Sequence, residues 1–316
     1  MDKYYFTSIS SEYLNEMTHV RGLSEVTIRG YSQDLNTLFK FLIQDSVDEF
    51  SDFNRMSVRR YLSWLDNSDY SRSSIVRKLS VLRNFFRWLH SRDYIKIDPV
   101  PLRVPMKKPK LLPKVLSENE VDRLVSAVIS YNTDLKNNNI FTARDIAILE
   151  LIYGSGLRVS ELAALNVDDI DFEDLKTRVI GKGNKERIVL FGEIAKNCLL
   201  DYMSIYRPKI LKDFDSSQNA LFLSTRGTRL SVRSIQHRIK NYAKYAGLSS
   251  WVHPHTLRHS FATHMMDGGA DIRVVQELLG HSSPATTQIY THVTGAQAVK
   301  TYMAAHPAAG IDEEEK

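Results

Sequence analysis

The chain has 316 residues, of which 43% are hydrophobic and 25% are charged, an ordinary globular balance for about two domains. It contains no apolar run near the ~18 residues of a membrane-spanning helix, and residues 1–10 lack the basic and apolar regions of a secretion signal. A single cysteine excludes an internal disulfide and a multi-cysteine zinc site, and it fits a reducing cytoplasm.

The net charge is only +5, but its distribution along the chain is uneven. Residues 53–110 include fourteen basic residues against four acidic ones. An excess of this kind is expected where a protein binds a polyanion, and a solvated helix face is the alternative explanation. We favour a DNA-binding surface. The residues expected to contact DNA are Arg72, Arg83, Arg87, Lys107 and Lys108.

Four helices are predicted in the first hundred residues. In the second of them, apolar residues recur every three to four positions, which makes one face apolar, and Ser24 is a suitable N-cap. In the fourth, Arg83 and Arg87 lie four residues apart and share one side. Together the helices predict a small bundle with a basic surface. Their expected ranges are 11–20, 24–44, 57–66 and 73–91.

A proline-rich stretch follows this bundle. Residues 98–113 contain five prolines and several lysines, and repeated proline favours an extended, stiff chain. Such a basic linker would let two domains wrap around a duplex, unless it is an inert spacer. We place an N-terminal helical domain at 1–106, a linker at 107–115 and a second domain at 116–316.

Most of the second domain is predicted to be helical. Ser117 and Glu120 form a capping box that starts one helix. Another helix is expected over 143–153, where Gly154 and Gly156 stop it, and a short one over 160–165. The polar, Asn-rich residues 131–142 are expected to form an exposed loop.

Two β-like runs lie within 177–191, on either side of a Gly-Lys-Gly-Asn-Lys turn, and predict a β-hairpin. The remainder of the domain is expected to be mainly helical. The fold class is therefore mainly α: a four-helix N-terminal domain, and a mostly helical second domain that carries a small antiparallel β-sheet.

Five segments rich in arginine, lysine, histidine and tyrosine indicate the chemistry. Cleaving a phosphodiester without a metal requires cations on the non-bridging oxygens, and the guanidinium forks of Arg158 and Arg258 suit this task. It also requires an in-line nucleophile, and the phenol of Tyr290 can form a covalent phosphoester. The segments are 156–162 (GLRVSEL), 181–187 (GKGNKER), 253–259 (HPHTLRH), 279–281 (LGH) and 289–292 (IYTH).

Proton transfer needs further groups. Lys182 at the hairpin turn can reach a leaving 5′-hydroxyl, and histidines handle protons near neutral pH. His255 and Arg258 are three residues apart, so a helix would place them on one face. The four histidines between 253 and 264 would suggest a metal, but their spacing matches no metal-site pattern, so no metal is expected. His264 is expected to be a buried, hydrogen-bonded helix residue.

Each of these residues alone also has an ordinary structural explanation: a capping arginine, a solvated turn lysine or a packed tyrosine. The ordered set, however, resembles the tyrosine recombinase (lambda-integrase) family, and its wording is similar to the Xer branch, which resolves chromosome dimers. The similar strings are GLRVSEL, VIGKGNKERIVL, HPHTLRHSFATHM, VQELLGHSSPATTQIYTHV and the closing AAHP at 304–307. The resemblance covers nearly the whole chain. The Asn-rich segment and the acidic residues 312–315 depart from the usual Xer pattern.

The resemblance implies a SAM-like core-DNA-binding domain at 1–106 and a catalytic domain at 116–316. In the catalytic domain, Arg158 and Arg258 would clamp the scissile phosphate, and His281 would donate a hydrogen bond to it. Tyr290 would be the nucleophile that forms a 3′-phosphotyrosine. One phosphodiester replaces another, so neither a cofactor nor ATP is expected for the chemistry.

The resemblance also assigns the proton-transfer groups and the partners. Lys182 would be the general acid for the 5′-oxygen, and His255 would assist proton transfer. The partners would be a double-stranded DNA recombination site and three further subunits, in a homo- or hetero-tetramer that forms a Holliday junction. A second Xer recombinase and a DNA translocase such as FtsK are further expected partners. Residues 296–305 would form a helix that docks into a neighbouring subunit, although packing within the same chain explains their apolar pattern as well.

Three alternatives stay open at this point. A mobile-element integrase would use the same chemistry for a different task. A type IB topoisomerase shares the arginine, lysine, histidine and tyrosine set, and a DNA relaxation assay would identify it. A DNA-binding protein of the same fold without cleavage would lack the covalent intermediate.

Overall fold

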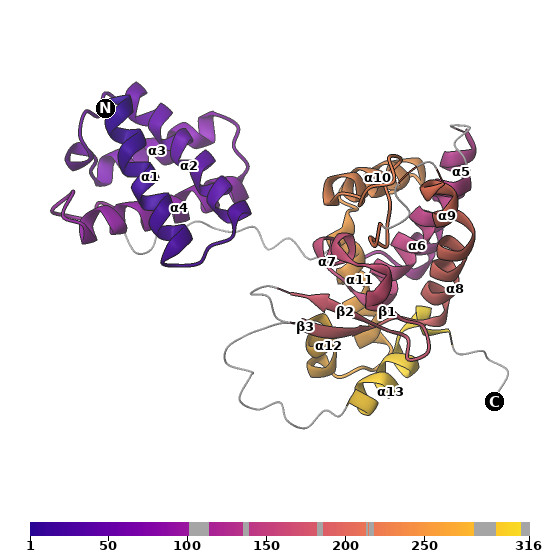
Figure 1. Cartoon of the computed structure of the whole chain (residues 1–316). Helices are drawn as coiled ribbons and strands as arrows, with labels where there is room; N and C mark the ends of the chain where they lie inside the picture. The colour runs from indigo at the N-terminus through magenta and orange to yellow at the C-terminus, as the bar shows by residue number, and fades with distance from the viewer. Residues whose placement is uncertain are drawn as a thin grey trace. The chain divides into compact units, whose positions relative to one another are not determined.

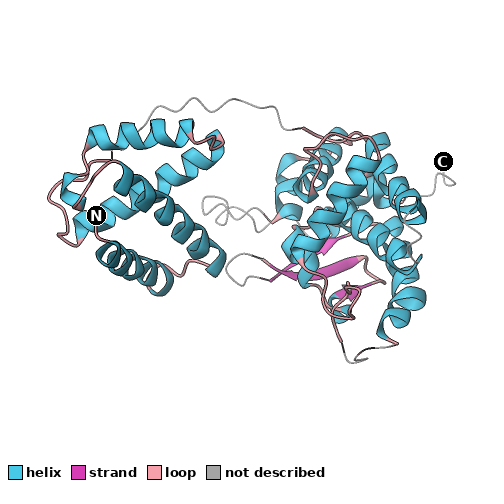
Figure 2. Ribbon diagram, turned by 90° about the horizontal axis from the view of Figure 1, so that it is seen from above, coloured by secondary structure: helices cyan, strands magenta, loops and turns pink. Residues whose placement is uncertain are grey.

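The computed structural model describes residues 1–100, 114–134, 139–181, 186–212, 214, 218–280 and 295–310. Contacts divide the chain into two compact units, Met1–Leu111 and Leu112–Lys316 (Figure 1). Helices dominate both units, and all the strands among the described residues belong to the second (Figure 2). Within those residues, no helix combines the length and the hydropathy that crossing a membrane requires.

Four α-helices make up most of the first unit, as the sequence predicted. The start of the first was predicted wrongly. α1 begins at Lys3, because the side chain of Asp2 accepts a hydrogen bond from the backbone N–H of Tyr5 at 2.9 Å and caps the helix. Ser24 caps α2 as expected. The helices are α1 (Lys3–His19), α2 (Glu25–Gln44), α3 (Arg55–Asn67) and α4 (Arg72–Ser91), with a 3-10 turn at Phe50–Asp52.

An aromatic cluster forms the centre of the first unit. The fully buried ring of Phe85 in α4 contacts the rings of Phe6 and Tyr13 in α1. Nearby, the buried Lys78 of α4 donates a hydrogen bond to Asp34 of α2 at 2.9 Å. Burial of large rings is the main stabilising contribution in such a bundle. These contacts fix which side of α4 faces solvent.

The second unit begins with the predicted capping box. The backbone N–H of Ser117 donates to Glu120 at 2.9 Å, and the N–H of Glu120 donates to the Ser117 hydroxyl at 3.3 Å. The helices that follow are α5 (Glu118–Asp134), α6 (Asn139–Ser155), α7 (Val159–Ala164), α8 (Glu193–Asp201), α9 (Arg207–Leu211), α10 (Val232–Tyr245), α11 (Pro254–Asp267), α12 (Ile272–Leu279) and α13 (Gly295–Ala305). Shorter turns lie at Val167–Asp169, Tyr202–Tyr206 and Pro307–Ala309.

The prediction of an exposed loop over residues 131–142 was wrong. α5 continues to Asp134 and α6 begins at Asn139, so both ends of that segment are helical. The ring of Tyr131 packs edge-on against the ring of Tyr242 in α10, with 5.3 Å between the centroids, and Asn132 is buried. The polar composition of the segment suggested a loop. The error arose because composition does not reveal a contact with a helix more than a hundred residues later in the chain.

A three-stranded antiparallel sheet contains the predicted hairpin. The strands are β1 (Ile170–Asp171), β2 (Lys176–Ile180) and β3 (Glu186–Leu190), in the order β1-β2-β3. Val179 and Val189 are buried, whereas Arg178 and Ile188 form an exposed cross-strand pair, as the alternation of a half-buried sheet requires. α12 contacts β3, and the two lie close together in Figure 1.

The last described helix, α13, packs against its own unit. Tyr302 is buried, and its hydroxyl donates a hydrogen bond to the carbonyl of Gly154 at 2.6 Å. The ring of His306, just after α13, lies among the rings of Tyr153, Phe261 and Tyr302. Two explanations were given for the apolar pattern of residues 296–305. In the isolated chain, these residues pack within their own unit.

Candidate active site

Arg158 stands at a turn between α6 and α7. Gly156 makes this turn with φ +62°, and a Cβ added there would lie 2.6 Å from the ring of Phe261, so the position requires glycine. Arg158 then occupies the N-cap position of α7, and its backbone N–H donates to Glu161. Its side chain is 40% exposed and donates to Glu161 at 2.8 Å. A rigid turn therefore presents one guanidinium at the surface.

Arg258, by contrast, is buried within α11, with 5% exposure. One of its terminal nitrogens donates to the carbonyl of Gly156, and the other donates to the carbonyl of Leu279 at 2.7 Å. These bonds use two of the five guanidinium N–H donors. Burial and the charge of Arg158 lower the pKa of Arg258 to about 10, so this side chain remains a cation at neutral pH.

The two carbonyls that Arg258 holds belong to the segments of two other predicted residues. Gly156 lies two positions before Arg158, and Leu279 lies two positions before His281. Arg258 therefore joins the turn that presents Arg158 to the end of α12. Three of the five predicted segments converge on this one guanidinium.

Glu161 and Arg187 are part of this site, although the sequence analysis gave neither a role. Glu161 is 4% exposed and accepts hydrogen bonds from the Arg158 side chain and from the Arg158 backbone N–H, each at 2.8 Å. It also pairs with Arg187 of β3 at 2.9 Å. Burial opposes ionisation of Glu161, but the Arg158 N–H and the charges of Arg187 and Arg158 outweigh it, so its pKa is lowered. The only sequence signal for Glu161 and Arg187 was that each lies inside one of the five segments.

His255 lies at the surface in the first turn of α11, three residues before Arg258, as predicted. Partial burial lowers its pKa, and the charges of His253, Arg258, His259 and Arg158 act in the same direction. His255 is therefore uncharged at neutral pH and can accept a proton. His255 and Arg258 thus share one side of α11.

Two other histidines of this segment, His253 and His264, have structural roles. His253 caps α11 by accepting from the N–H of Thr256 at 3.1 Å. His264 is buried and bonds to the hydroxyl of Tyr153 at 2.8 Å, which confirms the prediction of a buried, hydrogen-bonded residue. Among the residues that the structure describes, no three His, Cys, Asp or Glu side chains gather in an arrangement suited to a metal ion.

Three predicted catalytic residues lie outside the described residues. In the sequence, Lys182 directly follows Gly181, His281 directly follows Gly280, and Tyr290 comes between that glycine and the start of α13. Lys107 and Lys108 are likewise outside. The described ends of these segments lead toward the site, since β3 provides Arg187 and the end of α12 provides the carbonyl held by Arg258.

The predicted DNA-contacting residues that the structure describes are all on α4. Arg72 and Arg87 are exposed and have no ion-pair partner in the described part of the chain. Arg83 is half-buried, and its buried Nε–H has no acceptor among the residues that the structure describes. Other cations of the basic stretch are paired with acids: Arg60 with Asp45, Arg92 with Glu16, and Arg77 and Lys78 with the one carboxylate of Asp34.

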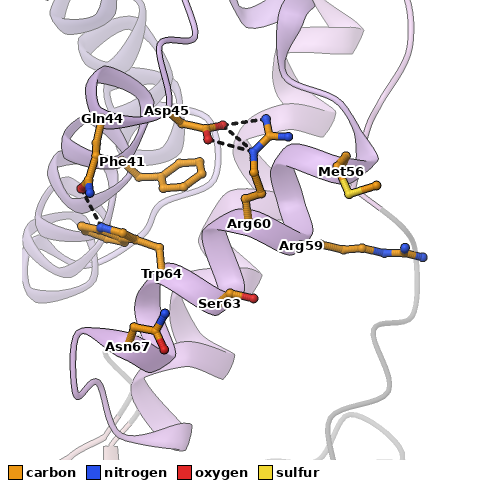
Figure 3. A pocket seen from close by; sticks show the side chains of 9 residues that line it. All are labelled: Phe41, Gln44, Asp45, Met56, Arg59, Arg60, Ser63, Trp64 and Asn67. Atoms are coloured by element: carbon orange, nitrogen blue, oxygen red, sulfur yellow. Dashed lines mark hydrogen bonds and ion pairs between the residues drawn. The ribbon is translucent and has the colours of Figure 1, made fainter.

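A surface hollow of about 490 Å³ lies in the first unit, between the end of α2 and α3. The indole N–H of Trp64 donates a hydrogen bond to the side chain of Gln44 at 2.8 Å, and Arg60 forms a bidentate ion pair with Asp45 (Figure 3). Arg59 extends away from this pair (Figure 3). None of the predicted catalytic residues lines this hollow.

Comparisons with known families match both units. The family model described as "Phage integrase family" matches residues 114–297. The model described as "Phage integrase, N-terminal SAM-like domain" matches residues 11–93. The first match includes the described arginines and the segments of the undescribed lysine, histidine and tyrosine.

Full-length relatives are similar to the chain throughout. The tyrosine recombinase XerC of Thermodesulfovibrio yellowstonii is 39% identical over 313 residues, covering 98% of this chain and 99% of the relative. The tyrosine recombinase XerD of Staphylococcus epidermidis is 39% identical over 302 residues, covering 96% and 99%. A solved structure of XerH site-specific recombinase bound to a palindromic difH substrate shares the fold, with a TM-score of 0.69, 21% identity, and coverage of 93% and 84%.

Proposed function

The chain belongs to the phage integrase family and is a Xer-type tyrosine site-specific recombinase, and we propose that Arg158 and Arg258 clamp the DNA phosphate that it cleaves. Cleavage concentrates negative charge on the non-bridging oxygens of the phosphate. Two guanidiniums held in fixed positions stabilise that charge without reorganising during the reaction. They also orient the phosphate, since each can donate two parallel hydrogen bonds.

The observation that supports this proposal best is the anchoring of Arg258. It is buried, it stays cationic, and its two backbone acceptors fix the plane of the guanidinium. A buried arginine without a carboxylate of its own is costly unless a ligand supplies the negative charge. Within the described residues Arg258 has carbonyl acceptors and no ion pair. A phosphate beside Arg158 would complete its partners.

Tyr290 is proposed as the nucleophile. Its phenolic oxygen forms a bond to phosphorus as the bond between phosphorus and the 5′-oxygen breaks, which leaves a 3′-phosphotyrosine and a free 5′-hydroxyl. Lys182 donates the proton to the leaving 5′-oxygen. Attack by the 5′-hydroxyl of a partner strand reverses the step and releases the tyrosine. The number of phosphoester bonds is unchanged, so the exchange needs no ATP.

Two histidines assist this exchange. His255 is uncharged at neutral pH, as the lowered pKa indicates, and can therefore accept the phenolic proton of Tyr290. His281 donates a hydrogen bond to the phosphate. The task proposed for the exchange is the resolution of chromosome dimers in the cytoplasm. Four subunits, of one or two kinds, assemble on two recombination sites and pass through a Holliday junction, under the control of a DNA translocase.

A nicked duplex tests this function directly. The duplex carries a chromosomal resolution site with a nick beside the cleavage point, so that the short fragment diffuses away and the covalent product accumulates. We expect a covalent protein–DNA band on a denaturing gel for the wild type and none for Tyr290→Phe, which lacks only the nucleophilic oxygen. Both should bind the duplex equally. A band that survives Tyr290→Phe contradicts the nucleophile, and binding by the wild type without a band contradicts the chemistry.

A further inference from the structure

Arg187 occupies a position in the site that the arginine clamp alone does not explain. It lies on β3 with a side chain that is 16% exposed, and its guanidinium has two partners. One terminal nitrogen pairs with Glu161 at 2.9 Å, and the other donates to the carbonyl of Leu278 at 2.8 Å. The sheet, α7 and the end of α12 are thereby joined through one side chain.

Glu161 is shared between two cations. One carboxylate oxygen accepts from the Arg158 side chain, and the other accepts from Arg187. With one negative charge against two positive ones, the three side chains together keep a net charge of +1. If Arg187 were neutral, Glu161 would cancel the charge of Arg158, and only Arg258 would remain to offset the phosphate.

Arg187 also supports the turn at the end of α12. Gly280 has φ +65°, and a Cβ added there would lie 2.6 Å from the Cδ of Arg187, so the arginine stem lies directly against this turn. The carbonyl that it holds belongs to Leu278, one residue before the carbonyl held by Arg258. Two arginines from different elements therefore fix successive carbonyls at the end of α12.

We propose that Arg187 is a positioning residue for cleavage: by sharing Glu161 it leaves the charge of Arg158 available for the phosphate, and by holding Leu278 it fixes the end of α12, whose next carbonyl Arg258 holds. This inference rests on the proposed function of the arginine clamp. Arg187 acts through Arg158 and the end of α12, and it has no need to touch the DNA.

A charge-restoring double variant separates this role from a purely structural one. Arg187→Met removes the charge and keeps the length of the side chain, and Glu161→Gln removes the carboxylate that Arg187 offsets. We expect Arg187→Met to slow single-turnover cleavage of the nicked duplex by about tenfold or more, with DNA affinity unchanged. The double variant should cleave faster than Arg187→Met alone, because no carboxylate is then left to cancel Arg158.

Three further variants complete the design. Arg187→Lys keeps a cation beside Glu161 and should retain more cleavage than Arg187→Met. If the methionine variant folds poorly, the comparison of Arg187→Lys with the wild type still tests the proposal. Arg178→Met, on the exposed face of β2, makes the same change in net charge outside the site and should cleave as the wild type does. Arg258→Ala reports on the clamp itself.

The outcomes distinguish the two proposals. Losses that simply multiply in the double variant, or full cleavage by Arg187→Met while Arg258→Ala is inactive, overturn the role of Arg187 and leave the clamp intact. Full cleavage by Arg258→Ala overturns the clamp and this role with it. Recovery in the double variant, together with retained cleavage by Arg187→Lys, supports the sharing of Glu161.

Discussion

The cations of α4 and those of the arginine site differ in how the fold holds them. Arg72 and Arg87 on α4 are exposed and have no ion-pair partner among the described residues. Arg258 and Arg187 in the second unit are largely buried, and backbone carbonyls or a shared carboxylate fix their guanidiniums. Both regions are rich in positive charge, but only the second has each charge in a defined position.

We expect the exposed cations to contribute mainly to DNA binding and the fixed cations to contribute mainly to cleavage. Exposed cations attract a polyanion over distances near the Debye length, and salt screens them. Cations held by fixed acceptors stabilise charge that develops at one point, and they do so without reorganisation. The way a cation is held, rather than the unit to which it belongs, should therefore decide what a mutation does.

Lys78 tests this rule inside the first unit, because it is buried like the arginines of the second. Asp34→Asn removes the carboxylate that both Lys78 and Arg77 contact. Leaving a buried cation without its partner costs ~3–5 kcal/mol, and we expect a loss of that order in the free energy of unfolding, measured by urea denaturation. Asp45→Asn, which frees only the exposed Arg60, is the control and should lose far less. Equal losses would break the comparison.

The features that the sequence predicted correctly are those that depend on residues close together in the chain. Ser24 and the pair Ser117–Glu120 were identified as caps because a cap depends on residues at most three positions apart. The hairpin was predicted from the alternation of its two runs and the glycines between them. Local patterns of this kind survive folding, because no distant contact is needed to form them.

Long-range contacts account for the errors and omissions. The helical ends of segment 131–142 depend on the packing of Tyr131 against Tyr242, which polar composition does not reveal. Glu161 and Arg187 are 26 positions apart, and their pairing appears only when β3 lies beside α7. The window count of basic residues overstated the free charge, because the acids that neutralise Arg60, Lys78 and Arg92 precede that window.

Arg258→Ala tests the arginines of the second unit whose guanidiniums are fixed by hydrogen bonds. We expect single-turnover cleavage to fall by about 10²-fold or more, as for the loss of a pre-organised donor at a developing charge. DNA affinity should change little, because the exposed cations remain. Arg207→Ala is the matched control: Arg207 also bonds to a backbone carbonyl, that of Ala220 at 2.9 Å, but lies outside the site. If both variants cleave equally well per folded molecule, position within the site has no special effect.

His306 shows what burial does to a base that has no ion pair within the described part of the chain. Tyr153, Phe261 and Tyr302 surround its ring, and His264 is the other titratable base nearby. Burial, with a smaller contribution from His264, lowers the pKa of His306 to about 3. Arg258 and Arg187 keep their charge because the fold supplies hydrogen-bond acceptors for their guanidiniums. His306 stays neutral because burial disfavours its charged form.

The unfolded state therefore binds a proton at His306 below about pH 6.5, and the folded state does so only near pH 3. Stability should fall as the pH decreases through this interval, by up to ~1.4 kcal/mol per unit from this group. His306→Phe keeps an aromatic ring and should show a weaker dependence in urea denaturation at pH 7, 6 and 5. Parallel curves for the variant and the wild type would show that the histidine is not neutral in the folded protein.

Three arginines of α4, the exposed Arg72 and Arg87 and the half-buried Arg83, should give the smallest effect per residue, on salt dependence rather than on cleavage. If Arg72, Arg83 and Arg87 bind phosphates, replacing each with alanine should reduce the slope of log affinity against log salt by about 0.9 for every phosphate that the arginine had neutralised. Cleavage at saturating protein should be unchanged, because none of the three belongs to the site. Arg92→Ala is the control, since Glu16 already neutralises Arg92. Anisotropy titrations between about 50 and 200 mM salt measure both quantities. An unchanged slope in the triple variant would mean that α4 faces away from DNA, and a loss of saturated cleavage would mean that exposed and held cations are not separate in function.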